Sequence, residues 1–260
     1  MRMSLPKMQS WATWQQAMRK LRLPTTVTPS SSVWEYSPPT SACRPSAVRM
    51  PAWFTRMRGA ALAKASGSPT LLGLASGLLL KALFAGHRGG LLRPPESAQL
   101  DYEGEIAIVI GEGGRRIKEA DAWKHVVGYS CYNDGSIRDW QVATTQWTAG
   151  KNFWRTGGFG PWMVSADEIA PDQRMTLTTR LNGQVMQQAT TDMMIHSIPR
   201  QIAYISTFIP LESGDVIVTG TPGGVGNKRS PQVFMKPGDV VEIAVDAIAI
   251  QRNGIRDEQV

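Results

Sequence analysis

From Pro94 onward, short β-rich runs alternate with turn signals of glycine, asparagine and proline, and this alternation limits the possible folds more than any other feature. The clearest signal is Asn182-Gly183 within residues 175–191, because both residues accept the positive φ of a type I′ hairpin turn. Further strands are expected within residues 103–111, 213–220 and 236–250, the last as one long strand. The pattern predicts a mainly β domain with few helices (α+β), sandwich or barrel-like.

We expect two helices among these strands. The first spans residues 115–128, because four apolar side chains recur at helical spacing before Gly128 ends it. The four are Ile117, Ala120, Trp123 and Val127. The second helix begins after Ser197, a capping residue, with Pro199 in its first turn. A short helical turn that starts at Ser136 is also expected.

Residues 1–95 differ in composition from the rest of the chain. They contain 13 Lys or Arg and one acidic residue, Glu35, for a charge of +12, whereas residues 96–260 contain 15 basic and 20 acidic residues, for −5. The net charge of +7 therefore belongs to a whole segment and not to one helix or stripe, so we expect no nucleic-acid partner. Residues 23–51 are rich in Pro, Ser and Thr, a composition with little capacity to bury a core.

Two interpretations of this segment remain open. Residues 1–23 are acid-free and carry Trp11 and Trp14 at helical spacing, as in a mitochondrial transit peptide. A run of Arg, Ala, Pro and Ser with almost no acid is also typical of an out-of-frame reading of a GC-rich gene, which we favour. We therefore expect residues 1–90 to be an atypical region, poorly ordered or partly structured, before a folded domain over residues 91–260.

The sequence also bears on location. No apolar run reaches the roughly 18 residues of a membrane span, and the nearest, residues 71–80, contains two glycines, so we expect no membrane association. Cys43 and Cys131 allow at most one disulfide, and without a recognised signal peptide we expect two free thiols in the reducing cytoplasm. The location becomes mitochondrial if residues 1–23 are a presequence.

Glu103 and Glu105 are the first candidate site residues. Residues i and i+2 of a strand point to the same side, and two neighbouring carboxylates repel unless a cation lies between them. The isoleucines that follow, Ile106, Ile108 and Ile110, favour a buried strand. The pair is either a cation site or the polar side of an amphipathic strand, and the residues alone leave both open.

Further candidates lie downstream. Asp134, Arg138 and Gln141 share one helical face if the turn after the strand extends that far, either as site residues or as a capping aspartate with an intrahelical Asp–Arg pair. Lys151 lies among aromatic residues, as a buried functional amine or as a lysine whose stem covers apolar surface. Thr221 belongs to the loop TGTPGGVG, which either offers N–H groups to a ligand oxygen or simply connects two elements.

Other chemistries are excluded by missing motifs. The three histidines are scattered, and without a HxxxH motif or a Cys/His cluster we expect no zinc site. The sequence has no GxSxG motif, so it does not predict an α/β-hydrolase. The TGTPGGVG loop lacks the Gly-Lys-Ser/Thr of a phosphate-binding P-loop.

In this order and spacing, these segments resemble the fumarylacetoacetate hydrolase family over about residues 91–260. The matching stretches are LDYEGEIAIVIG, GYSCYNDGSIRDWQ, GKNFW, GGFGPWMVSADEI, LNGQVMQQATT, SIPRQIAYISTFIPLESGDVIVTGTPGGVG and MKPGDVVEIAV. Each stretch is weak alone, but together they are highly specific. The resemblance implies a mixed β-sandwich roll, a catalytic domain over residues 91–260 and a homodimer.

The resemblance also implies roles for the candidate residues. By it, Glu103, Glu105 and Asp134 hold a Mg²⁺ or Mn²⁺ ion, and Lys151 is the active-site lysine. Arg138, Gln141 and Thr221 are its substrate-binding residues. Three carboxylates and no soft ligand suit such a hard cation, which leaves positions for water and a chelating 2-oxo acid.

The implied function is that of a metal-dependent hydrolase or lyase, acting on the C–C bond of a β-diketo or 2-oxo acid in aromatic-compound catabolism. One departure matters: the family's His-x-x-Glu acid/base pair, expected about 40 residues before Glu103, does not occur in residues 1–95. The alternatives are an isomerase or decarboxylase of a 2-hydroxymuconate-type diacid, or a catalytically impaired relative. The sudden return of family-like sequence near residues 86–97 is why we favour an out-of-frame N-terminus.

Overall fold

A computed structural model describes residues 48–49, 61–65, 74–78 and 84–260, and all of them belong to one compact unit, Arg44–Val260. The presequence and out-of-frame interpretations of the N-terminal segment concern residues that lie almost entirely outside this description, as does Cys43. The boundary expected after residue 90 stays a prediction. Cys131 is a free, buried cysteine.

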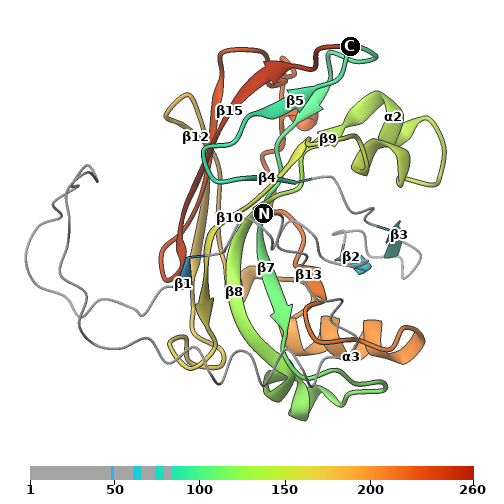
Figure 1. The fold of residues 1–260 in the computed structure, drawn as a ribbon, viewed down its shortest axis with the longest axis vertical. Helices are drawn as coiled ribbons and strands as arrows, with labels where there is room; N and C mark the ends of the chain where they lie inside the picture. The colour runs from blue at the N-terminus through green and yellow to red at the C-terminus, as the bar shows by residue number, and fades with distance from the viewer. Residues whose placement is uncertain (1–47, 50–60, 66–73, 79–83) are drawn as a thin grey trace, which may run out of the picture. The chain divides into compact units, whose positions relative to one another are not determined.

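The larger sheet of the described residues contains six strands (Figure 1). In spatial order they are β1 (Val48–Arg49), β10 (Gly157–Ser165), β8 (Val126–Asn133), β7 (Gly104–Ile110) and β13 (Val216–Val218), with β4 (Phe84–Gly86) also beside β10. The β4–β10 pair is parallel, and the other pairs are antiparallel. All seven residues of β7 are buried, as expected for a central, mostly apolar strand.

The second sheet has five strands. They are, in spatial order, β12 (Gln184–Thr190), β11 (Thr176–Leu181), β14 (Val240–Val245), β15 (Ala249–Asp257) and β5 (Leu91–Arg93). The β11–β12 hairpin turns at Asn182 and Gly183, whose φ angles of 51° and 81° confirm the predicted type of turn. β5 and β15 run parallel, so residues 91–93 pair with residues 255–257 near the end of the chain.

Two small sheets and several short helices complete the described elements. The small sheets pair β2 (Ala61–Ala65) with β3 (Leu74–Leu78), and β6 (Leu100–Asp101) with β9 (Ser136–Ile137). The α-helices are α2 (Arg138–Val142) and α3 (Ile198–Phe208), and the 3-10 helices are η2 (Glu119–His125), η3 (Ala149–Lys151), η4 (Thr191–Met193) and η5 (Gly226–Lys228). Ser197 caps α3 by accepting from the Arg200 N–H, as predicted. No helix in the described part of the chain combines the length and the apolar run that crossing a bilayer takes.

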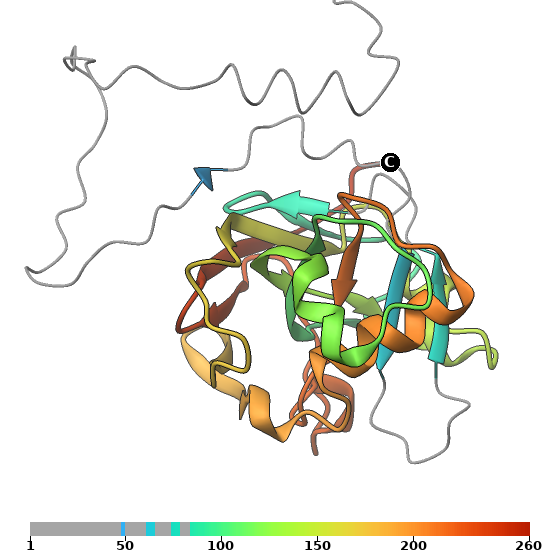
Figure 2. The ribbon, with the colours of Figure 1, turned by 90° about the horizontal axis from the view of Figure 1, so that it is seen from below.

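Both large sheets contribute to one apolar core. Ile106, Ile108 and Ile110 from β7 belong to the same buried cluster as Val241 and Ile243 from β14. Figure 2 shows the strands of both sheets from a second direction, with α3 on the outside. The predicted fold class, mixed sheets with few helices, is therefore confirmed.

The two sheets approach each other closely at Gly104, the first residue of β7. A Cβ atom there would lie 2.1 Å from Oγ1 of Thr179 on β11 and 3.3 Å from Cδ1 of Ile243 on β14. Only glycine allows this approach, and it brings the start of β7 against the second sheet. Glu103 and Glu105 flank this contact point and are buried with it.

Three predicted element boundaries are wrong. The helix expected over 115–128 is only the 3-10 turn η2, because Val126 already pairs with Ile110 as part of β8 and leaves Val127 42% exposed. The strand expected over 236–250 breaks after Val245, where the chain turns from β14 into β15. Ser136 lies in β9, paired with Asp101, so α2 begins only at Arg138.

Candidate metal centre

Three carboxylates meet where β7 begins and β8 ends. Register pairs Gly104 with Asn133, and the Asp134 N–H donates to the Glu103 carbonyl at 2.9 Å, so the two strand ends are held together. Each of Glu103, Glu105 and Asp134 can offer one ligand oxygen, and these atoms all lie within 4.8 Å of one another. The three side chains are buried, so the polar-strand alternative for the glutamate pair does not hold.

Lys151 enters this group from η3. Its Nζ atom lies 2.9 Å from Glu103 Oε2 and 2.8 Å from Asp134 Oδ2, and it also donates to Ser136 Oγ. The side chain is buried, which makes it an amine inside the site and not a stem that covers the surface. Gly150 permits the approach, because a Cβ atom there would lie 2.4 Å from the Gln141 backbone nitrogen.

Arg138 lies on the other side of Glu103. Its Nη1 atom is 2.7 Å from Glu103 Oε1 and donates to Gln141 Oε1 at 2.7 Å, while its Nε atom donates to Asp101 Oδ2 at 2.7 Å. The intrahelical Asp134–Arg138 pair, the alternative interpretation, is therefore replaced by three longer-range ion pairs. Asp134 pairs with Lys151, and Arg138 pairs with Asp101 and Glu103.

Carboxylates outnumber cations among the described residues of this buried cluster. Four carboxylates are grouped there with two cations. The carboxylates are Asp101, Glu103, Glu105 and Asp134, and the cations are Arg138 and Lys151. Like charges that are buried close together repel, and a divalent cation between the carboxylates would offset that repulsion. An all-oxygen donor set also suits a hard cation, so the residues present fit a divalent metal.

The third carboxylate, Glu105, is oriented by the glycine-rich loop. Its Oε2 atom accepts from the Gly220 N–H at 2.9 Å. Burial, and after it the carboxylates of Asp134 and Glu105, raises the pKa of Tyr132 well above its ordinary value of 10.0. Tyr132 is therefore a neutral phenol beside the carboxylates at physiological pH.

Some N–H groups of the glycine-rich loop and of the residue after it bind buried carboxylates. Besides the bond to Glu105, N–H groups of Gly226 and Asn227 donate to Asp101. Thr221 is partly exposed, and its Oγ1 accepts from Gln187 Nε2 at 2.8 Å. Its predicted contact with substrate is untested and stays a prediction.

Sequence reasoning missed two residues of this region. Asp101 precedes Glu103 and Glu105 with the same spacing of two, a signal that was available because alternate residues of an extended segment share a side. Gln187 is buried on β12 and accepts from the Gly104 N–H at 3.0 Å. No local pattern marks it, since it comes from the second sheet.

Within the described residues, the converging ligand group contains neither histidine nor cysteine. His125 instead contacts the Glu112 carbonyl through Nδ1, and the His196 carbonyl accepts from Gln201. The carboxylate chemistry expected from the sequence is therefore the chemistry that the fold assembles here.

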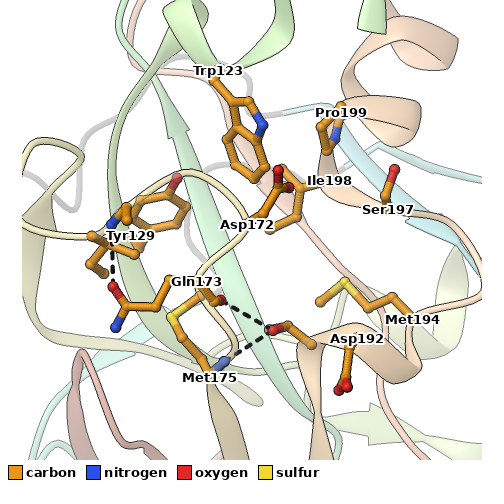
Figure 3. A pocket seen from close by; sticks show the side chains of 13 residues that line it. Trp123, Tyr129, Asp172, Gln173, Met175, Asp192, Met194, Ser197, Ile198 and Pro199 are labelled. Carbon is orange, nitrogen blue, oxygen red and sulfur yellow. Dashed lines mark hydrogen bonds between the residues drawn. The ribbon is translucent and has the colours of Figure 1, made fainter. Parts of the chain in front are cut away.

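A separate cavity of about 250 Å³ lies away from these residues (Figure 3). Trp123, Tyr129 and Asp172 face it, together with the first residues of α3. Tyr129 pairs with Ile108, four positions along β7 from Gly104, and none of the predicted site residues lines the cavity. The carboxylate cluster, and not this cavity, is the candidate site.

Known proteins are similar to this chain in sequence and in fold. The model for the C-terminal region of fumarylacetoacetate (FAA) hydrolases matches residues 78–256, more than half of the chain. The mitochondrial oxaloacetate tautomerase FAHD2A of Bos taurus is 40% identical over 167 residues, which is 64% of this chain and 53% of that protein. The chain spans about half the length of the curated relatives it matches.

Solved structures show the same similarity. The fumarylacetoacetate hydrolase of psychrophilic Exiguobacterium antarcticum has a TM-score of 0.73 at 30% identity, covering 78% of this chain and 76% of that one. The fumarylpyruvate hydrolase of Pseudomonas aeruginosa, in complex with Mn²⁺ and pyruvate, has a TM-score of 0.63 at 25% identity, covering 70% of this chain and 78% of that one. These relatives are enzymes that act on small organic acids.

Proposed function

This chain belongs to the fumarylacetoacetate hydrolase family, and we propose that it is a metal-dependent enzyme that interconverts the keto and enol forms of an oxaloacetate-like 2-oxo acid. The buried cluster of Glu103, Glu105, Asp134 and Lys151 carries the proposal, because it combines a divalent-cation site with an amine that can move a proton. The name of the bovine relative, oxaloacetate tautomerase, supports this choice of reaction.

We propose Mg²⁺ or Mn²⁺ as the metal, held by Glu103, Glu105 and Asp134. Such a cation supplies Lewis-acid polarisation of the carbonyl of a 2-oxo acid. The Mn²⁺ in the fumarylpyruvate hydrolase complex supports Mn²⁺, and the all-oxygen donor set accommodates either ion.

Lys151 is the proton carrier in this proposal. An ammonium has three N–H donors, and those of Lys151 go to Glu103, Asp134 and Ser136. With a cation bound, Glu103 and Asp134 would hold Nζ of Lys151 less tightly. The reaction removes a proton from carbon 3 and places one on the oxygen of carbon 2, so it needs neither water nor a redox partner.

Arg138, Gln141 and Thr221 are proposed to bind the carboxylates of the substrate. Arg138 has the donor capacity for this role, since its Nη2 atom has no hydrogen-bond partner among the described residues. A planar guanidinium also matches the geometry of a carboxylate. Gln141 holds Nη1 of the same guanidinium and so fixes its orientation.

Hydrolytic C–C cleavage is the second candidate. The Mn²⁺ and pyruvate in the fumarylpyruvate hydrolase complex favour it, because an acylpyruvate and water yield an acid and pyruvate. Attack by water needs a positioned general base, typically worth 10²–10⁴-fold in rate. The ligand group in the described residues has no histidine for that purpose, which ranks cleavage below tautomerisation.

The deciding experiment follows enol oxaloacetate as it converts to the keto form, with metal-free protein and with added Mn²⁺ or Mg²⁺. Metal without protein is the blank, because free cations also accelerate this reaction. We expect metal-dependent acceleration by the protein and loss of it in Glu105→Gln. Equal rates with protein and with the metal blank would rule out the tautomerase, and fast acetylpyruvate cleavage would favour the hydrolase.

Location and assembly are proposed on the same basis. The word mitochondrial in the name of the bovine relative favours the mitochondrial alternative over the cytoplasm. The homodimer implied by the sequence resemblance remains a proposal. Light scattering of the purified chain measures its mass in solution, and a mass of one chain would contradict the dimer.

A further inference from the structure

Asp101 is a fully buried carboxylate at the end of β6, and it collects four N–H donors. Its Oδ1 atom accepts from the N–H groups of Tyr102 and Gly226, both at 2.8 Å. Its Oδ2 atom accepts from Arg138 Nε at 2.7 Å and from the Asn227 N–H at 2.9 Å. An ionised carboxylate has about four acceptor sites, so this one is saturated by fixed donors.

The backbone of η5 packs directly against this carboxylate. A Cβ atom on Gly226 would lie 2.7 Å from Asp101 Oδ1 and 1.7 Å from the Val233 carbonyl oxygen, so only glycine fits. The same loop carries Gly220, whose N–H holds Glu105, and Thr221. Asp101 therefore ties the loop beside the candidate metal centre to the strand end that bears the glutamates.

Asp101 also restrains Arg138. A guanidinium is planar, so a bond that fixes Nε also fixes the direction of Nη1, which contacts Glu103 Oε1 at 2.7 Å. With Asp101 present, the charge of Arg138 is shared between two carboxylates. Without Asp101, that charge would fall on Glu103 alone and compete there with a bound cation.

We propose that Asp101 is a positioning residue of the metal centre, which keeps Glu103 available to a divalent cation by taking up the charge of Arg138. The inference rests on the proposed metal site but not on the identity of the substrate. Asp101 is not one of the converging ligand residues, so its effect on the metal centre passes through Arg138.

The test measures the affinity of the full chain for Mn²⁺, with no substrate present. The electron paramagnetic resonance signal of the free ion gives the fraction that is not bound. Asp101→Asn should weaken Mn²⁺ binding about tenfold, the scale of one charge-assisted hydrogen bond. Arg138→Met should strengthen it, because the competing cation is gone. The double variant should bind Mn²⁺ as Arg138→Met does, since Asp101 then has no arginine to restrain.

Asp239→Asn is the matched control. Asp239 is also buried and accepts from the Lys236 N–H and from Asn182 Nδ2, both at 2.9 Å, in a turn of the second sheet. It should lower thermal stability and leave Mn²⁺ affinity unchanged. If Asp101→Asn alone does not fold, the double variant can still be compared with Arg138→Met to test the coupling. Arg138 is absent from both, so neither contains an arginine that has lost its carboxylate partner.

Three results would overturn the proposal. They are unchanged Mn²⁺ affinity in folded Asp101→Asn, a further loss of affinity in the double variant relative to Arg138→Met, and a wild-type chain that binds no Mn²⁺. Failure of the proposed tautomerase activity is a separate outcome. A wild-type chain that binds Mn²⁺ but does not act on oxaloacetate would leave the role of Asp101 supported by the binding series alone.

Discussion

Lys151 Nζ lies 2.9 Å from Glu103 Oε2, an ion pair between residues 48 positions apart in the chain. Both side chains are buried, and Glu103 also receives Nη1 of Arg138 on its other oxygen. A proposed metal ligand is thus held by two protein cations. Metal affinity and the positions of these cations should therefore depend on one another.

Lys151→Met should make Mn²⁺ bind about tenfold more tightly, because it removes a cation that competes for Glu103 and Asp134. Keto–enol conversion should fall by 10²–10⁴-fold, because the proton carrier is lost. Calorimetric titration and a rate assay measure the two effects. Lys124→Met is the control, since that exposed lysine pairs with Asp121 on η2. Weaker Mn²⁺ binding in Lys151→Met would contradict the assigned competition.

Glu105→Gln should weaken Mn²⁺ binding by about 100-fold while the fold is kept, because the amide oxygen can still accept from the Gly220 N–H. Calorimetric Mn²⁺ titration gives the affinity, and circular dichroism checks the fold. Glu242→Gln is the comparison, since Glu242 pairs with Arg252 in the second sheet. An equal loss in both variants would mean that Glu105 is not a ligand.

Gly104→Ala should lower the free energy of unfolding by about 1–3 kcal/mol, because the new methyl group would lie 2.1 Å from Thr179 Oγ1. Thr179→Ala removes that oxygen and should restore part of the loss in the double variant. Urea unfolding of the four proteins measures the coupling. Strictly additive effects would show that the two residues do not touch.

The raised pKa of Tyr129 predicts a loss of folding stability at alkaline pH. Burial, followed by the charge of Asp172, raises the pKa of Tyr129 from 10.0 to about 12. Because the folded-state pKa lies above the unfolded value, this contribution to stability is complete below about pH 10 and is lost as the pH rises to 12. Wild type should lose more stability over that range than Tyr129→Phe.

Asp172→Asn separates the two causes of this shift. Removing the Asp172 charge should lower the pKa of Tyr129 while burial keeps it above 10.0. Ultraviolet titration of tyrosinate in each variant, with Tyr129→Phe subtracted, measures this pKa. A Tyr129 pKa near 10 in the wild-type fold would contradict the burial of its hydroxyl.

Elements with strong local signals were predictable. The Asn182-Gly183 turn and the Ser197 cap each depend on the conformation or hydrogen bond of one or two residues, and both are found where expected. The helix predicted over 115–128 failed because Val126 finds a strand partner in Ile110. A partner on another strand is invisible to a periodicity that considers one segment at a time.

The same distinction between local and long-range signals applies to the candidate site. Local pattern was enough to pair Glu103 with Glu105, because alternate residues of a strand share a side whatever the rest of the chain does. Only the tertiary structure decided the partners of Asp134 and Arg138, which local spacing had offered to each other. The β7–β8 register brings Asp134 to Glu103 and Lys151, while the β6–β9 pair brings Arg138 to Asp101. Strand register is a long-range property, and it determines which buried charges meet.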